Sequence, residues 1–256
     1  MKDKQLDNIR GFKKEIWNNP FNLSTSLITL NQLNIEKSID ELLENDVNML
    51  HLDILDGQFS PEMPLGFRMI EDIKNLYGNS IFYDAHVMVN NPEFYVDKLI
   101  DIGVDHICFH YETAPHVDGL LNKIHNYGIR GGVALKPATP LTQLEYVLEK
   151  CDSVLVMMFN PGYSWSSAEQ QIEYTKRKVV DLKEMINKKG LNTKIIIDGR
   201  INIQNVLDWA LDIVDIFVAG STLINREHIS ECLRYINKSV RGKNVANKTN
   251  MLKEND

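Results

Sequence analysis

Short apolar segments rich in β-branched residues alternate along the chain with longer segments in which apolar residues recur every three or four positions. The first pattern is typical of buried β-strands, and the second is typical of amphipathic helices. The predicted strands, eight in number, cover residues 22–28, 48–55, 80–87, 104–110, 129–135, 153–159, 193–198 and 213–219. The helical segments between them include IEKSIDELLEN, NPEFYVDKLIDIG, PLTQLEYVLEKC and INIQNVLDWALD. This alternation predicts βαβ units around a parallel sheet.

Eight strands that are each followed by a helix predict an α/β protein with a (β/α)8 TIM-barrel fold. The chain length of 256 residues agrees, because such barrels need about 250 residues or somewhat fewer. A doubly wound open sheet is the alternative, but no GxGxxG follows the first strand to support it. We expect an N-terminal arm or short helix over residues 1–22, a single barrel over 23–238, and a disordered polar tail over 239–256.

The composition is that of an ordinary globular protein, with 43% hydrophobic and 25% charged residues. The net charge of −7 does not favour nucleic acid or an anionic membrane as a partner, so a small molecule is expected instead. Cys108, Cys151 and Cys232 are scattered, which argues against a disulfide framework and a structural zinc site. With no signal peptide and no apolar run of about 18 residues, the protein is expected to be soluble and cytoplasmic.

Polar residues lie at the carboxyl ends of three predicted strands, which is where barrel enzymes place their catalytic groups. In HLDILDG, the two-residue period of a strand places His51 and Asp53 on the same face. His86 lies near the end of the third strand, and Asp198 ends the seventh. Two imidazoles and two carboxylates can surround one divalent cation, and they suit zinc, iron(II), manganese or cobalt better than calcium. The alternative is that these are turn or capping residues.

Six motifs between about residues 26 and 224 occur in the order and spacing of the ribulose-phosphate 3-epimerase family: HLDILDGQFSP, DAHVMV, GVALKPATPL, VLVMMFNPGY, IIIDG and VAGS. The chain resembles this family over most of its length. The resemblance implies a barrel of the ribulose-phosphate-binding type with one divalent metal ion. It implies His51, Asp53, His86 and Asp198 as the metal ligands, and Asp53 with Asp198 as the acid/base pair.

The resemblance also implies a set of substrate-binding residues. Ser26 is expected to face the substrate at the end of the first strand. Met88 and Met157 are expected to line the reaction site, although each is equally consistent with plain barrel core. The phosphate is expected beside the loops after the seventh and eighth strands, against backbone N–H groups at a helix N-terminus. The residues expected at this end are Gly162, Gly199, Arg200, Gly220 and Ser221.

The sequence departs from the family's pattern around the expected phosphate site. Arg200 replaces a family glycine, Ser164-Trp165-Ser166 replaces a glycine-rich stretch, and Ser60 with Glu62 replaces the usual Val and Asn. Arg200 supplies a charge-assisted contact to the phosphate, or it is a solvated loop arginine. Trp165 is expected to narrow the mouth of the site or to form a lid. These departures leave the exact sugar open.

Three further polar residues end predicted strands. His110 and Glu112 end the fourth strand and resemble family residues, but the resemblance implies no ligand role for them. Lys136 ends the fifth strand, where a Schiff-base aldolase is conceivable. A loop lysine near the phosphate site is the favoured interpretation, because lysine-dependent relatives in this barrel group place a DxKxxD motif on a strand and HLDILD lacks that lysine.

The implied reaction is the inversion of C3 in a phosphorylated ketose, most simply D-ribulose 5-phosphate to D-xylulose 5-phosphate. One acid/base group removes a proton from one face and a second returns a proton to the other, which is the role of Asp53 and Asp198. The metal ion stabilises the enediolate. D-allulose 6-phosphate, a hexulose phosphate, is the alternative substrate, and a non-catalytic sugar-phosphate-binding barrel is the alternative of another class. A homo-oligomer is consistent with the family resemblance.

Overall fold

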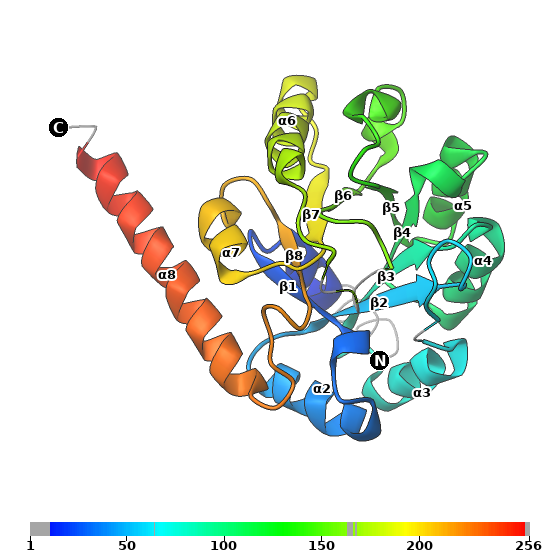
Figure 1. Ribbon diagram of the computed structural model, residues 1–256, viewed down its shortest axis with the longest axis horizontal. Coiled ribbons are helices and arrows are strands. Elements are labelled where there is room, and N and C mark those ends of the chain that lie inside the picture. The colour runs from blue at the N-terminus through cyan, green and yellow to red at the C-terminus, as the bar shows by residue number, and fades with distance from the viewer. Residues whose placement is uncertain (1–10, 64, 163–165, 167, 254–256) are drawn as a thin grey trace.

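The computed structural model describes residues 11–63, 65–162, 166 and 168–253. Its centre is a closed barrel in which neighbouring strands are parallel and follow one another in chain order (Figure 1). The strands are β1 (Asn22–Ser26), β2 (Met49–Leu55), β3 (Phe82–Met88), β4 (His106–His110), β5 (Arg130–Leu135), β6 (Ser153–Met157), β7 (Lys194–Asp198) and β8 (Ile216–Ala219). The TIM-barrel prediction and all eight predicted strands are therefore confirmed.

Helices surround the barrel and cover its outer face (Figure 1). They are α2 (Ile35–Glu44), α3 (Phe67–Tyr77), α4 (Pro92–Ile102), α5 (Val117–Asn126), α6 (Glu173–Lys189), α7 (Ile203–Trp209) and α8 (Ile229–Lys253). Strand residues alternate between this outer layer and the barrel interior, so each strand is buried on both faces. Among the described residues, no helix combines the length and the apolar character that crossing a bilayer requires.

The segment between β5 and β6 differs from the predicted α-helix. It forms two 3₁₀ turns, η4 (Leu141–Leu144) and η5 (Leu148–Lys150). Its hydrogen bonds join residues three apart, as from the N–H of Val147 to the carbonyl of Leu144. Leu141, Leu144 and Val147 recur every three residues, which is the spacing that a 3₁₀ helix aligns on one side.

The N-terminal arm closes the amino-terminal end of the barrel. Residues 11–18 are helical, and Trp17 from this helix packs with the interior residues of the strands. The Trp17 ring stacks on Phe82 with a centroid separation of 5.7 Å and lies 5.1 Å from His106. Lys13 anchors the same helix through a 2.6 Å ion pair with Asp105. The carboxyl-terminal end of the barrel is left for the candidate site.

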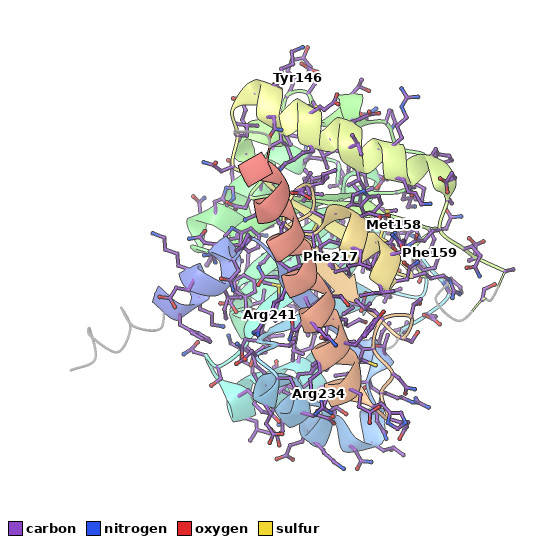
Figure 2. The ribbon with its side chains drawn as sticks, turned by 90° about the vertical axis from the view of Figure 1, so that its left-hand side faces the viewer. Tyr146, Met158, Phe159, Phe217, Arg234 and Arg241 are labelled. Atoms are coloured by element: carbon purple, nitrogen blue, oxygen red, sulfur yellow. The ribbon has the colours of Figure 1, made fainter. Side chains whose placement is uncertain are left out.

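The C-terminal residues are helical where the sequence predicted a disordered tail from residue 239. Helix α8 continues to Lys253 (Figure 1 and Figure 2), which corrects that expectation for the described residues 239–253. Ile229, Leu233, Ile236 and Val240 are buried at helical spacing and fix the start of α8 against the barrel. Extending an existing helix gains one hydrogen bond for each residue that is ordered, without the cost of starting a new helix. Residues 239–253 contain no proline to interrupt it.

Candidate active site

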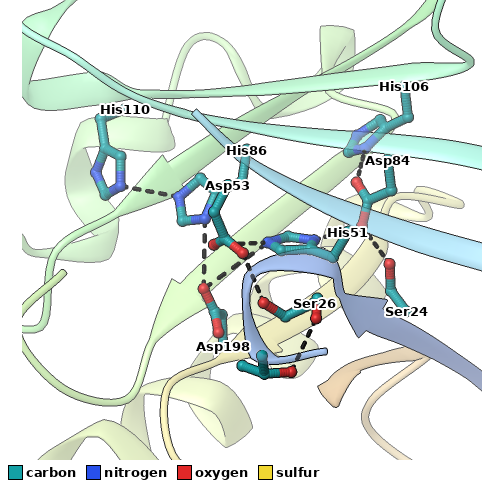
Figure 3. A network of polar contacts seen from close by, with 10 residues as sticks. Ser24, Ser26, His51, Asp53, Asp84, His86, His106, His110 and Asp198 are labelled. Atoms are coloured by element: carbon teal, nitrogen blue, oxygen red, sulfur yellow. Dashed lines mark hydrogen bonds and ion pairs between the residues drawn. The ribbon is translucent and has the colours of Figure 1, made fainter. Parts of the chain in front are cut away.

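The four predicted ligands meet at the carboxyl-terminal end of the barrel. His51 and Asp53 face inward from β2, His86 from β3, and Asp198 ends β7 (Figure 3). Asp53 pairs in register with His86 on the neighbouring strand. Each of the four residues offers one ligand atom, and these atoms all lie within 4.8 Å of one another. Barrel closure therefore brings together residues that are up to 147 positions apart in the chain.

The donor atoms of this His/Asp cluster fit a divalent cation. His51 Nε2 lies 3.6 Å from Asp53 Oδ1 and 3.9 Å from Asp198 Oδ2. His86 Nδ1 lies 3.3 Å from Asp198 Oδ2. Both nitrogens are buried without a hydrogen-bond partner, although buried polar atoms are nearly always satisfied. Two nitrogen and two oxygen donors converging on one point are the ligands of zinc and of the other metals that the sequence predicted.

Electrostatics favour a positive charge at the centre of the cluster. Burial lowers the pKa of His51, but the nearby charges of Asp84 and Asp53 outweigh burial and raise it to about 10. Burial raises the pKa of Asp53 and Asp198, and the two carboxyl groups are close enough to influence each other. Burial also lowers the pKa of His86 well below its usual value. His51, Asp53 and Asp198 thus hold protons more readily than exposed groups do, whereas His86 holds its proton less readily.

Asp84 supports His51 from behind. Its Oδ2 accepts hydrogen bonds from His51 Nδ1 and Ser24 Oγ, both at 2.8 Å. Its Oδ1 accepts one from His106 Nδ1 at 2.7 Å (Figure 3). His106 Nε2 contacts Ser153 Oγ at 2.7 Å. Burial raises the pKa of Asp84, but the two imidazoles hold it well below its usual range. The bond at Nδ1 leaves Nε2 as the His51 nitrogen that faces the cluster.

The sequence-based prediction did not include Asp84 as the carboxylate that supports His51. Asp84 lies two residues before His86, so strand alternation places both inside the barrel, and that spacing was a usable signal. Nothing in the sequence marks His106 or Ser153 as its partners. The residues join only because β3, β4 and β6 contribute to the same interior layer.

A pocket with a cavity volume of about 80 Å³ opens above the cluster. Asp53 and Asp198 lie on its wall, and Ser26 Oγ donates a 2.7 Å hydrogen bond to Asp53 Oδ2. Every substrate-binding residue predicted from the sequence lines this pocket. These are Ser26, Met88, Met157, Gly162, Gly199, Arg200, Gly220 and Ser221, and Glu62 lines it as well.

Two glycines in the pocket wall are sterically required. Gly199 has a φ of +111°, and a Cβ there would lie 2.3 Å from Phe159 Cδ1. Gly162 has a φ of +80°, and its Cβ would lie 1.8 Å from that of Ser60. Both positions combine a left-handed backbone with a close approach, so a side chain at either one would displace its neighbour.

Arg200 brings a positive charge to a pocket wall whose other charged residues are acidic. It is a non-glycine residue with a φ of +50°, and it is half-buried. Its Nη2 donates a 2.5 Å hydrogen bond to the carbonyl of Ser166, and its Cζ lies 5.8 Å from the centre of the Phe159 ring. Ser164 and Trp165 lie outside the described residues, and so does the predicted lid.

The expected helix N-terminus beside the phosphate site is replaced by a turn. The N–H groups of Leu223 and Ile224 donate to the carbonyl of Gly220, and α8 begins only at Ile229. After β7, the side chain of Asn202 caps α7 by accepting from the N–H groups of Gln204 and Asn205. Loop backbone, rather than a helix end, therefore forms this part of the pocket.

Lys136 lies outside the pocket wall. Its Nζ is 4.0 Å from the centre of the Phe59 ring, and the same ring lies 4.7 Å from that of His110. Phe59 thus lies between this lysine and the buried histidines, which agrees with the preferred interpretation of Lys136 as a loop residue.

A closed eight-stranded barrel with inward-facing His and Asp residues at the carboxyl ends of its strands defines a TIM-barrel enzyme. The chain belongs to the ribulose-phosphate 3-epimerase family, whose sequence profile matches residues 22–224. It is therefore classed with the epimerases, a group of isomerases.

Curated relatives support this family assignment. A ribulose-phosphate 3-epimerase from Schizosaccharomyces pombe is 30% identical over 220 residues, which cover 85% of this chain and 93% of the relative. One from Serratia marcescens is 29% identical over 206 residues, covering 80% of this chain and 96% of the relative. Both alignments span almost the whole of the relative.

Solved structures share the fold at low sequence identity. The 3-hexulose-6-phosphate synthase from Salmonella typhimurium superposes with a TM-score of 0.67 at 17% identity, covering 87% of this chain and all of that one. A structure of KGPDC from Streptococcus mutans gives a TM-score of 0.64 at 13% identity, covering 87% of this chain and 98% of that one. At these identities the similarity demonstrates the barrel alone.

Proposed function

We propose that this protein is a metal-dependent 3-epimerase of a phosphorylated ketose that converts D-ribulose 5-phosphate to D-xylulose 5-phosphate. The observation that supports this most directly is the pair of buried carboxyl groups, Asp53 and Asp198, on the wall of one pocket. They come from β2 and β7, which are not neighbours in the barrel. Two separate acid/base groups are what inversion of a carbon beside a carbonyl requires.

The two aspartates exchange roles between the two directions of the reaction. The ionised carboxylate removes the C3 proton, and the protonated carboxyl returns a proton to the opposite face. Burial raises the pKa of both groups, which allows one of them to stay protonated while the other is ionised. The 2.7 Å hydrogen bond from Ser26 orients Asp53 beside the substrate.

His51, Asp53, His86 and Asp198 would hold one divalent cation, which is zinc, iron(II), manganese or cobalt by the donor types. When bound, the cation supplies positive charge that stabilises the negative charge developing on the substrate oxygens. Met88 and Met157, both buried on the pocket wall, exclude water from the reacting carbon.

The phosphate binds at the end of the pocket formed by Gly199, Arg200, Gly220 and Ser221. The guanidinium of Arg200 provides a charge-assisted hydrogen bond, and the loop N–H groups provide the others. A positively charged side chain is needed beside the phosphate, because the net charge of the chain is −7 and does not attract an anion.

Solvent exchange at C3 tests the proposal. The zinc-, manganese- or cobalt-loaded protein is mixed with D-ribulose 5-phosphate in heavy water, and loss of the C3 proton signal is followed by NMR together with formation of the epimer. D-allulose 6-phosphate is compared in parallel, and faster exchange with it would assign the hexulose phosphate as the substrate. No exchange with either sugar would refute the epimerase assignment.

Two aspartate variants define the roles. We expect Asp198→Asn to abolish epimerisation, because an amide cannot transfer a proton on its face of C3. Asp101→Asn removes an exposed carboxylate on α4 and serves as the control that keeps full activity. Retained epimerisation in Asp198→Asn would refute the role of Asp198.

A further inference from the structure

His86 is supported differently from His51. His51 bonds directly to a carboxylate, whereas His86 Nε2 lies 3.0 Å from Nε2 of a second histidine, His110. Both imidazoles are fully buried, and their ring planes are inclined by 26° at a centroid distance of 5.1 Å (Figure 3). A hydrogen bond between two imidazole nitrogens needs one protonated and one unprotonated nitrogen. The tautomer of His110 therefore determines the tautomer of His86.

Glu112 determines the tautomer of His110. Its Oε2 lies 3.0 Å from His110 Nδ1, and its Oε1 accepts hydrogen bonds from the N–H of Lys136 at 2.7 Å and from the hydroxyl of Thr139. Burial raises the pKa of Glu112, but the bonds from His110, Thr139 and Lys136 outweigh burial and lower it to about 2. Glu112 is therefore an ionised carboxylate that can only accept, so His110 Nδ1 carries the proton.

The proton positions then follow along the chain of contacts. His110 is fully buried, an environment that favours the neutral imidazole, and its single N–H is the one at Nδ1 that donates to Glu112. Its Nε2 must accept from Nε2–H of His86. The remaining nitrogen of His86, Nδ1, is unprotonated, and it is the one that lies 3.3 Å from Asp198 Oδ2 in the cluster.

We propose that Glu112 is a positioning residue that, acting through His110, fixes the tautomer of His86 so that Nδ1 presents its lone pair to the His/Asp cluster. Metal-binding histidines usually donate their second N–H directly to a carboxylate or carbonyl. Here a second imidazole carries that connection from the barrel interior to a carboxylate in the loop after β4. The role rests on the proposed function, because a lone pair at this point serves a bound cation.

The loop that holds Glu112 in place is itself anchored. Lys178 from α6 is only 8% exposed. Its Nζ donates to the carbonyls of Lys136 at 2.8 Å, Pro137 at 3.3 Å and Thr139 at 2.6 Å. The two groups that bond Glu112 Oε1 come from this anchored loop. The backbone N–H of Lys136 can only donate, so Oε1 must accept.

Glu112→Gln tests this role without changing the size of the side chain. The donors from Lys136 and Thr139 require the carbonyl oxygen of the glutamine, so its NH2 group faces His110 Nδ1. That contact reverses every donor in the relay and places a proton on His86 Nδ1. We expect the affinity for Zn²⁺ to fall about 10–100-fold, which is the usual effect of losing a supporting partner. Glu145→Gln, on an exposed residue after β5, is the control.

Nitrogen-15 NMR of the imidazoles in metal-depleted protein reports the tautomer directly. We expect His86 to be protonated at Nε2 in the native protein and at Nδ1 in Glu112→Gln. The relay is refuted if native His86 carries its proton on Nδ1, or if Glu112→Gln keeps the native tautomer and the native Zn²⁺ affinity. If the native protein has the expected tautomer but binds no Zn²⁺, Mn²⁺ or Co²⁺, the metal dependence fails while the relay is supported.

Discussion

Replacing Asp84 by asparagine tests the carboxylate that supports His51. In the native protein, Asp84 accepts from His51, Ser24 and His106 at 2.7–2.8 Å. We expect the single carbonyl oxygen of asparagine to stay with His51 and Ser24, so that its NH2 group faces His106. His106 can adopt the other tautomer, because its second partner, the hydroxyl of Ser153, can accept as well as donate. In Asp84→Asn every hydrogen bond of this network is therefore still made, but the group that accepts from His51 is neutral.

The magnitude follows from the loss of charge on the acceptor. A hydrogen bond to a charged group contributes about 1.5–3 kcal/mol, and one to a neutral group about 0.5–1.5 kcal/mol. The difference for the His51 bond is about 1–1.5 kcal/mol, which corresponds to about a tenfold change in a binding constant. We expect Asp84→Asn to bind Zn²⁺ about tenfold more weakly than the native protein, and more tightly than Glu112→Gln, in which the relay is reversed.

Competition between the protein and a chromophoric chelator for Zn²⁺ measures both variants, with Asp101→Asn as the control. An unchanged affinity in Asp84→Asn would show that the carboxylate charge does not act on the cluster. A loss of about 100-fold or more would show that His106 cannot change its tautomer. Either result refutes the reasoning.

Three further predictions concern the arm, the phosphate end and the pocket wall. Trp17→Ala should lower the free energy of unfolding in urea by about 3–5 kcal/mol, because the ring is only 8% exposed at the amino-terminal end of the barrel. A loss no larger than that of Tyr146→Ala, at a residue 94% exposed, would show that Trp17 does not close the barrel end. Arg200→Gly should raise KM for the sugar phosphate about tenfold with little change in kcat, because a charged hydrogen bond of about 1.5–3 kcal/mol is lost. Glycine adopts the φ of +50° at this position without strain. An unchanged KM in steady-state kinetics would show that Arg200 does not bind the phosphate. Gly199→Ala should lower the free energy of unfolding by about 1–3 kcal/mol, because the added Cβ meets the Phe159 ring. Gly11→Ala is the control, because the Cβ added there meets nothing within 4 Å. Equal stability of the two variants would refute the clash.

Local patterns in the sequence determined the barrel and the four residues of the cluster. The eight strands were predicted because each is a short β-branched run that is buried on both faces, and this signal is complete within a few residues. His51 and Asp53 were assigned to one face by alternation alone. That these residues belong with His86 and Asp198 was predicted from their positions at strand ends and was strengthened by the resemblance in motif order. The structure brings the ligand atoms of all four within 4.8 Å of one another.

Other features depended on contacts between segments far apart in the chain. The sequence predicted a helix after β5 and disorder after residue 238, and the structure has 3₁₀ turns and a continued helix there. In both places the polar and apolar spacing is compatible with more than one backbone. Burial of Leu144 and Leu148 against the core favours the 3₁₀ turns. Burial of Ile229, Leu233, Ile236 and Val240 fixes the start of α8, from which the helix continues.

The support of the two histidines was decided only by the tertiary structure. His106 is 22 residues from Asp84 and 47 from Ser153, and their hydrogen bonds form only because the closed barrel places β3, β4 and β6 in one interior layer. Glu112 is close to His110 in sequence, but its direction as an acceptor is set by Lys136 and Thr139, more than 20 residues away. The sequence by itself therefore determined which side chains face the interior. Barrel closure determined their neighbours, and those neighbours fix the proton positions on which the chemistry of the site depends.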